Sequence, residues 1–312
     1  PHVHGAARND NLYQIDGIDQ NDIQTGIGEL AISPEVIESL ELITGGMPAE
    51  MGRAMGGIFK ATTKSGENVW HGSLRLDYID PGWAEDPDSD KEMYIPKQDE
   101  YVMPTLTVRG PILRNKLWFM LAYSWYSFDE TVAAAYNSYY GDAVNEHTFS
   151  HPFIKLTAQP GDNHFINVTW FSQLLTEDNV YGYGNSPRER MLWQEQELGS
   201  STLGVDWRWM VNDAFSMQFK FGKYIREINI YPEKRSDDPR DAPFTSDETY
   251  TRRDFNNGRF WSEDSRCNDQ YALDIEWVPD DFLGRHRVKA GFEYQQQTRD
   301  EMVKYAGGAR YT

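Results

Sequence analysis

The feature that most constrains the fold is an alternation of apolar and polar residues with a period of two. Nine segments show it: 73–78, 102–109, 117–126, 153–158, 165–172, 202–210, 215–224, 270–278 and 287–295. In the clearest one, Phe219 and Phe221 lie on the opposite face from Lys220. Successive side chains of a β-strand point to opposite faces, so the pattern predicts nine two-faced strands.

The connections between these segments alternate between short and long. The short ones are 110–116, 159–163, 211–214 and 279–285, and the long ones are 79–101, 127–148, 173–201 and 225–268. A soluble antiparallel sandwich also has alternating strands. Short turns on one rim and long loops on the other are typical of an outer-membrane barrel. We therefore favour the barrel, with short turns on the periplasmic side and long loops outside the cell.

Composition and charge support this choice. Aromatic residues make up 14% of the chain, with 10 Trp and 18 Tyr, although the mean hydropathy is -0.69. Transmembrane barrels combine these properties because only every second strand residue meets lipid and aromatic residues gather at both interfaces. Ionised residues recur on the polar faces, among them Asp206, Arg208, Lys220, Asp274 and Glu276, which suits a wet lumen. The net charge of -19 argues against a nucleic-acid partner.

The sequence excludes several other classes. Cys267 is the single cysteine, so neither an intrachain disulfide nor a thiolate zinc site is expected. No apolar run approaches the ~18 residues of a membrane-spanning helix. The first residues do not form a signal peptide, and any export leader is expected to lie outside this chain. We find no catalytic triad and no phosphate-binding loop, so we expect neither an enzyme nor a cofactor.

Residues 1–68 predict a small α/β unit. Asp16–Gly17 is expected to form a tight turn between two short strand segments. Ser33 and Pro34 predict the start of a short helix that reaches about Ser39, and strands are expected at 40–43 and 58–63. A unit of this size with few apolar residues is marginal alone, so we expect it to need support from the rest of the protein.

Several motifs of this unit resemble the plug domain of TonB-dependent outer-membrane receptors, closest to the Oar-like group that carries a carboxypeptidase-regulatory-like domain. The motifs are YQIDG at 13–17, SPEVIE at 33–38, ITGG at 43–46, AEMGRA at 49–54, GG at 56–57 and TKSG at 63–66. RGPILRNKLWF at 109–119 is similar to the first periplasmic turn of the same group.

The resemblance implies an all-β membrane fold, a 22-stranded antiparallel barrel with a small α/β plug in its lumen. It divides the chain into the C-terminal part of the plug, residues 1–68, and the first nine barrel strands, residues 69–312. The chain is then expected to be a fragment that lacks a leader, a coupling box, the early plug and later strands. The implied partners are the TonB–ExbB–ExbD complex, outer-membrane lipid and lipopolysaccharide, and a surface lipoprotein.

Three sets of residues are candidate sites. Glu50 and Arg53 match the charged plug motif and are candidates for a latch against the barrel, or for an ordinary local ion pair. The candidates for substrate contact are aromatic residues of the long loops: Tyr139, Tyr140, Tyr181, Tyr183, Phe260 and Trp261. Asp86, Asp88 and Asp90 have the alternate spacing of a calcium loop but lack its central glycine, so a solvated acidic loop is favoured.

The expected function is TonB-dependent import of a large or scarce nutrient across the outer membrane of a Gram-negative bacterium. Such a nutrient would be an oligosaccharide, a peptide or a chelate. The alternative is a surface-binding or secretion-associated barrel with little nutrient uptake. The loops have mixed charge, for example Lys234–Arg235 beside Asp237–Asp238, and do not specify the substrate.

Overall fold

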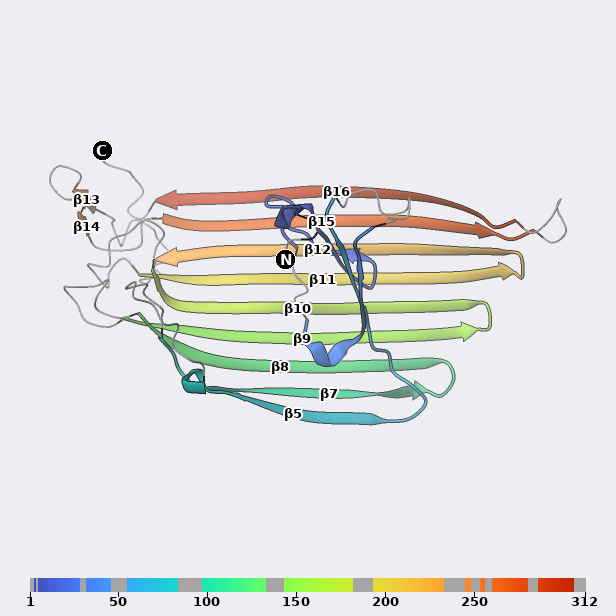
Figure 1. Cartoon of the computed structure of the whole chain (residues 1–312), viewed down its shortest axis with the longest axis horizontal. Helices are drawn as coiled ribbons and strands as arrows, with labels where there is room; N and C mark the ends of the chain where they lie inside the picture. Colours follow the sequence, from blue (N-terminus) through green and yellow to red (C-terminus); the bar gives the residue numbers. More distant parts are fainter. Residues whose placement is uncertain are drawn as a thin grey trace.

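The computed structural model describes residues 3, 5–28, 32–45, 55–83, 97–132, 143–181, 193–232, 245–247, 253–255, 260–279 and 286–305. They form a large antiparallel sheet with a small mixed sheet packed on one face (Figure 1). We call the face that contacts the small sheet the inner face, and the opposite one the outer face. Among the described residues, no helix has both the length and the apolar character needed to cross a bilayer.

The large sheet contains the nine predicted strands in their chain order. They are β5 (His71–Ile79), β7 (Tyr101–Leu113), β8 (Leu117–Val132), β9 (Ala143–Gly161), β10 (His164–Tyr181), β11 (Trp193–Asn212), β12 (Phe215–Pro232), β15 (Phe260–Trp277) and β16 (Val288–Tyr305). A short strand, β6 (Lys97–Gln98), pairs with β8, and β13 (Thr245–Asp247) pairs with β14 (Arg253–Phe255). The prediction of an antiparallel all-β fold is confirmed.

The strands are longer than the alternation predicted, and the extra length lies at the long-loop end. β9, for example, covers 19 residues instead of the six expected at 153–158. In this half of the strands, polar residues such as Glu146 and His147 lie on both faces, so apolar and polar residues no longer alternate along the sequence. At the other end, turns of only two or three residues join β7 to β8, β9 to β10 and β11 to β12 (Figure 1).

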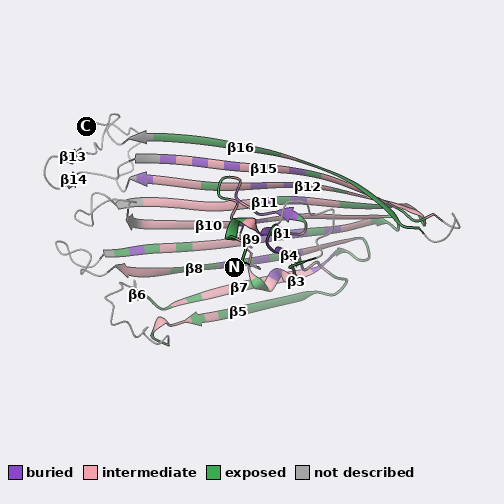
Figure 2. Cartoon of the chain, turned by 45° about the horizontal axis from the view of Figure 1, so that its top comes forward, coloured by how far each residue is buried: buried purple, intermediate pink, exposed green. Residues whose placement is uncertain are grey.

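The two faces of the large sheet are the reverse of those of a soluble sheet. Apolar side chains of the outer face are exposed, for example Leu74 (66%) and Trp207 (40%). Inner-face polar residues are buried, for example Thr105 (2%) and Thr202 (1%). Buried and less buried residues therefore alternate along the strands (Figure 2). This pattern fits a barrel wall with lipid outside and polar contacts inside.

The small sheet has the order β2-β1-β4-β3. Its strands are β1 (Leu12–Ile15), β2 (Ile18–Asp19), β3 (Ile37–Ile43) and β4 (Ile58–Thr63). β1 pairs parallel with β4 and antiparallel with β2. Asp16 and Gly17 join β1 to β2, and their φ values are positive, 49° and 84°. A two-residue hairpin turn with positive φ at both positions favours the pair Asp-Gly.

The helix predicted from Ser33 to about Ser39 is wrong in extent. The structure has a 3-10 turn, η2 (Pro34–Val36), capped by the Ser33 hydroxyl, which accepts from the Glu35 amide. The chain enters β3 at Ile37 because residues from there on pair with β4. The cap was recognised correctly, but sheet pairing replaces the rest of the helix. Two further 3-10 turns, η1 (Arg8–Asp10) and η3 (Pro81–Trp83), complete the helical residues described.

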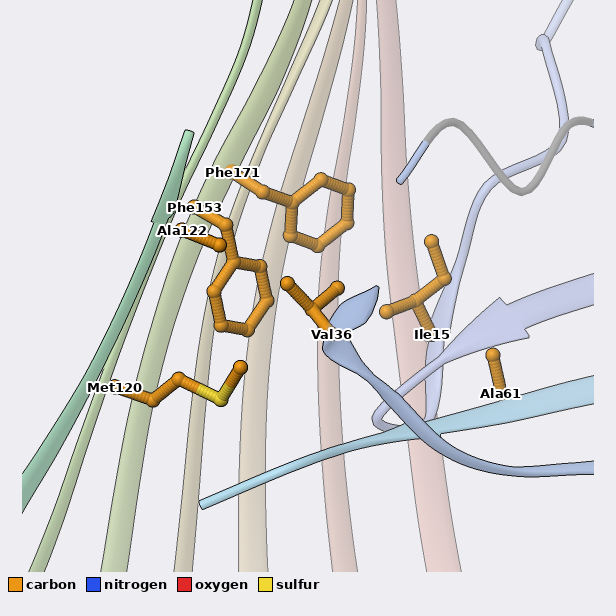
Figure 3. Close-up of a cluster of buried hydrophobic side chains, with 7 residues drawn as sticks. All are labelled: Ile15, Val36, Ala61, Met120, Ala122, Phe153 and Phe171. Carbon is orange, nitrogen blue, oxygen red and sulfur yellow. The ribbon is translucent and has the colours of Figure 1, made fainter. Parts of the chain in front are cut away.

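An apolar cluster joins the two sheets (Figure 3). Val36, from η2, lies among Met120 and Ala122 of β8, Phe153 of β9 and Phe171 of β10; Ile15 and Ala61 complete the cluster. Val36 is fully buried. Burial of such a side chain contributes roughly 1.5–3 kcal/mol. The large sheet thus supplies the apolar partner that the small unit was predicted to need.

Candidate functional site

The candidate site is the contact between the small sheet and the inner face of the large sheet. A hairpin formed by β1, the Asp16–Gly17 turn and β2, which we call the docking hairpin (Leu12–Asp19), makes many of its polar contacts. On the large sheet these contacts follow one row of cross-strand partners. The row consists of Lys155 on β9, Thr169 on β10, Gly204 on β11, Gly222 on β12 and Gln270 on β15.

An ion pair holds the turn of the hairpin. Lys155 Nζ lies 3.1 Å from Asp16 Oδ2, and it also donates to the Thr63 carbonyl and hydroxyl at 3.0 and 2.9 Å. The Thr63 amide donates to Asp16 Oδ1 at 2.9 Å, and the Thr169 hydroxyl donates to Oδ2 at 3.3 Å. Lys155 is only 4% exposed. A buried ammonium needs partners for its three donors, and here all three have one.

In the middle of the row, two glycines of the large sheet let a side chain of the hairpin pack against the backbone. Gly204 and Gly222 are direct cross-strand partners, and Ile18 of β2 lies against both. A Cβ atom at Gly222 would stand 2.5 Å from Ile18 Cδ1, and one at Gly204 would stand 3.3 Å from Ile18 Cγ1. A larger residue at position 222 would therefore displace the hairpin.

At the end of the row, Gln270 pairs with the backbone of β2. Its Oε1 accepts from the Asp19 amide and its Nε2 donates to the Asp19 carbonyl, both at 2.9 Å. The side-chain amide thus takes the place of a neighbouring strand for this edge residue. Both hydrogen-bonding groups of the Asp19 backbone are satisfied by this side chain, without strand pairing between the two sheets.

Beyond β2, the chain climbs the inner face toward the long-loop end. Gln20 Oε1 accepts from the Thr202 hydroxyl at 2.8 Å. Asp22 Oδ2 accepts from Arg266 Nη1, also at 2.8 Å. The other oxygen of Asp22 organises its own loop, because it accepts from the amides of Gln24 and Thr25. One carboxylate therefore both shapes the loop and fastens it to β15.

The charge state of Asp22 depends on this contact. Burial by itself raises the pKa of the carboxyl, but hydrogen bonds from Arg266 and Thr25 oppose it, and the resulting pKa is below its ordinary value of 3.8. The carboxylate is thus the favoured form in the docked state. The contact is strongest when Asp22 is ionised.

The segment between β4 and β5 is fastened to the turn between β7 and β8. Asn68 Oδ1 accepts from the Asn115 amide and from Trp118 Nε1, at 2.8 and 2.9 Å. Arg109 Nη1 lies 3.0 Å from Glu67 Oε1. A Cβ atom at Gly66 would stand 2.4 Å from the Phe119 carbonyl oxygen. Two motifs noted in the sequence, 63–66 and 109–119, therefore lie side by side.

Most of the predicted site residues lie outside the described residues. This holds for Glu50 and Arg53, for Tyr139, Tyr140 and Tyr183, and for Asp86, Asp88 and Asp90. Tyr181 ends β10, and Phe260 and Trp261 begin β15. Their backbone is therefore strand, where the sequence predicted loop, because β10 and β15 continue past their apolar halves. The roles proposed for all these residues stay predictions.

Sequence reasoning missed the contacts that the structure shows. Asp16 was predicted as a turn residue, which is confirmed, but its ion pair with Lys155 was not foreseen. Lys155 lay in a segment predicted as strand, but Asp264 and Arg266 lay in 225–268, which was predicted as a loop, and no local pattern indicated the partners of these three residues. Within the part of the chain that the structure describes, no group of three His, Cys, Asp or Glu residues is placed to hold a metal ion.

The chain is similar to known outer-membrane proteins in fold and, over part of its length, in sequence. No family model matches the chain. The TonB-dependent transporter Oar of Myxococcus xanthus is 32% identical over 130 residues, which cover 39% of this chain and 12% of the relative. The outer membrane transporter YddB of Escherichia coli superposes with a TM-score of 0.67 at 17% identity, over 97% of this chain and 42% of YddB.

A second solved structure has the same fold. The ferripyoverdine receptor of Pseudomonas aeruginosa gives a TM-score of 0.63 at 10% identity and covers 97% of this chain and 38% of the receptor. The chain thus spans less than half the length of these proteins. Over nearly its whole length the chain therefore shares the fold of these two outer-membrane proteins, and over 130 residues it is similar in sequence to the TonB-dependent transporter Oar.

Proposed function

We propose that this chain is part of an outer-membrane transporter that imports a large or scarce nutrient when its plug is moved by the TonB–ExbB–ExbD complex. The nutrient class is an oligosaccharide, a peptide or a chelate. Residues 1–68 act as part of the plug, and the strands from residue 69 onward act as part of the barrel wall. The long loops face outward and the short turns face the periplasm.

The observation that carries the proposal is the chemistry of the docking hairpin. Its described contacts with the large sheet are the Asp16–Lys155 ion pair, hydrogen bonds, Ile18 set against two glycines, and the share of Ile15 in the apolar cluster. When a polar contact of this kind breaks, its groups form hydrogen bonds with water instead, so the net free-energy cost is about 0.5–1.5 kcal/mol for a typical hydrogen bond. A unit held in this way is firmly placed at rest and can be detached by applied work.

The fold likeness supports the same conclusion. Oar and YddB are named as transporters, and the ferripyoverdine receptor was solved with ferripyoverdine bound. We propose transport and not catalysis for this chain as well. Glu50 and Arg53 remain our candidates for a further contact between plug and wall, and the six loop aromatics remain candidates for ligand contact.

The test is energy-dependent uptake by cells. Cells with and without the full-length protein are given mixtures of oligosaccharides, peptides and iron chelates, and the compounds that leave the medium are identified by mass spectrometry. We expect depletion that requires the protein and stops when a protonophore collapses the proton gradient. Depletion that continues unchanged without the gradient would contradict coupling to the inner membrane and favour a surface-binding role.

A further inference from the structure

Three arginines form a row on the inner face, at the level of Asp22. Arg226 on β12 is the direct cross-strand partner of Arg266 on β15, which is in turn the partner of Arg299 on β16. We call Arg226, Arg266 and Arg299 the three-arginine row. Like charges directly opposite each other destabilise a sheet. The row therefore requires anions beside it.

The large sheet supplies part of that compensation. Asp264 accepts from Arg266 Nη2 at 2.6 Å and from Arg299 Nη2 at 2.9 Å. Glu301 lies 2.9 Å from Arg299 on the more exposed side. These two carboxylates are built into β15 and β16, so they stay in place whatever the plug does. They serve the Arg266 and Arg299 end of the row.

The other end of the row relies on the plug. Asp22 accepts from Arg266 at 2.8 Å and lies 3.9 Å from Arg226 Nε. Among the described residues, the guanidinium of Arg226 has no hydrogen-bond partner, and this side chain is 28% exposed. A guanidinium presents five donors in a planar fork that matches an oxyanion. Arg226 thus has guanidinium donors available for an anion, and the nearby carboxylate of Asp22 belongs to the proposed plug, which moves during transport.

We propose that the three-arginine row is a receptor for an oxyanion of the transported ligand, a carboxylate or a phosphate, which takes the place of Asp22 beside Arg226 and Arg266. This inference rests on the proposed function and adds the chemical class of the ligand. If the plug left with no replacement, the guanidiniums would keep their charge with less compensation. A ligand anion removes that cost, so binding and plug release favour each other.

The coupling is reciprocal, which makes it measurable on the purified full-length protein. If an anion lowers the affinity of the wall for Asp22, then Asp22 must lower the affinity for the anion by the same factor. The probes are succinate and inorganic phosphate, with uncharged succinamide as the matched control. Affinities are measured by calorimetry at constant ionic strength, for the wild type and three variants.

We expect the Asp22→Asn variant to bind succinate or phosphate at least fivefold more tightly than the wild type, because a competing charge is gone. The Arg226→Gln variant should bind at least tenfold more weakly. Lys223 lies on the outer face of the same strand, so the Lys223→Gln variant should bind both anions with the affinity of the wild type. Preference between the two probes then distinguishes carboxylate from phosphate chemistry.

A second readout follows the loop itself. Succinate should accelerate hydrogen exchange in peptides that cover residues 20–28 of the wild type, and should have no such effect in Arg226→Gln. The inference is overturned if neither oxyanion binds the Asp22→Asn protein, or if Arg226→Gln binds as well as the wild type. These measurements need no uptake. Energy-dependent import without anion binding would remove this inference alone, and anion binding without import would remove the proposed function alone.

Discussion

Lys155 and Asp22 show how single charged residues place the small sheet. Lys155 is a cation of the large sheet whose three acceptors are supplied by Asp16 and Thr63. Asp22 is an anion that follows the docking hairpin, and its partner, Arg266, belongs to the large sheet. Removing one member of a buried pair costs about 3–5 kcal/mol when the other is left without compensation. The two contacts therefore hold residues 12–25 at two heights on the inner face of the large sheet.

The Asp22 contact should respond to acid. Because the pKa of docked Asp22 lies below its ordinary value of 3.8, the contact contributes fully at pH above that value and is lost as the pH falls through the lowered pKa. We predict that the passive conductance of the full-length protein in planar bilayers rises as the pH is lowered through this window.

The control for this effect is Asp22→Asn. It has no titrating group at this position, so its conductance should start higher at neutral pH and should lack the acid-dependent step. An equally large step in the variant would assign the acid response to other groups and contradict the role given to Asp22.

At the scale of the element, the position of the docking hairpin depends on the glycines at 204 and 222 as much as on charged residues. We predict that Gly222→Leu lifts the hairpin, because even a Cβ atom there would stand 2.5 Å from Ile18 Cδ1. Hydrogen exchange of the β1 amides in the full-length protein should accelerate at least tenfold. Shortening the hairpin side chain with Ile18→Ala in the same protein should restore part of the protection.

Gly199→Ala is the matched control for the hairpin. Gly199 lies on β11, and a Cβ atom there would meet its nearest neighbours at the ordinary distance of 3.4 Å. Its exchange should match that of the wild type. Unchanged β1 protection in Gly222→Leu would show that the hairpin does not rest on the glycine pair.

The elements differ in how far the sequence predicts them. The nine strands follow from a local rule, the period of two, and their number and order are confirmed. The helix after Ser33 was overestimated because pairing of β3 with β4 is not visible locally. The docking contacts could not be predicted at all. Asp16 and Lys155 are 139 residues apart, and Asp19 and Gln270 are 251 apart, so their meeting depends on the register of every strand between them.

At the scale of the whole molecule, the reversed faces indicate how the sheet is placed in a bilayer under the proposed function. On β12 the outer face is apolar at Phe215, Met217, Phe219 and Phe221 and becomes polar at Lys223. A stretch of about seven residues at roughly 3.3 Å each is about 23 Å long, and at a strand tilt of about 40° it spans about 18 Å of the apolar band, which is about 25 Å tall in outer-membrane barrels. Phe219 thus lies near the middle of the band.

At this height, the same added charge should have different effects on the two faces of the sheet. Phe219→Arg puts a cation on the lipid side, where the cost at mid-bilayer is about 2–4 kcal/mol. Gln218→Arg puts one on the inner side, within reach of Asp206, whose Oδ1 lies 2.7 Å from Gln218 Nε2. In urea titrations of the full-length protein refolded into lipid vesicles, Phe219→Arg should lose that amount and Gln218→Arg less than about 1 kcal/mol. Equal losses, or a larger loss for Gln218→Arg, would mean that lipid does not cover the outer face.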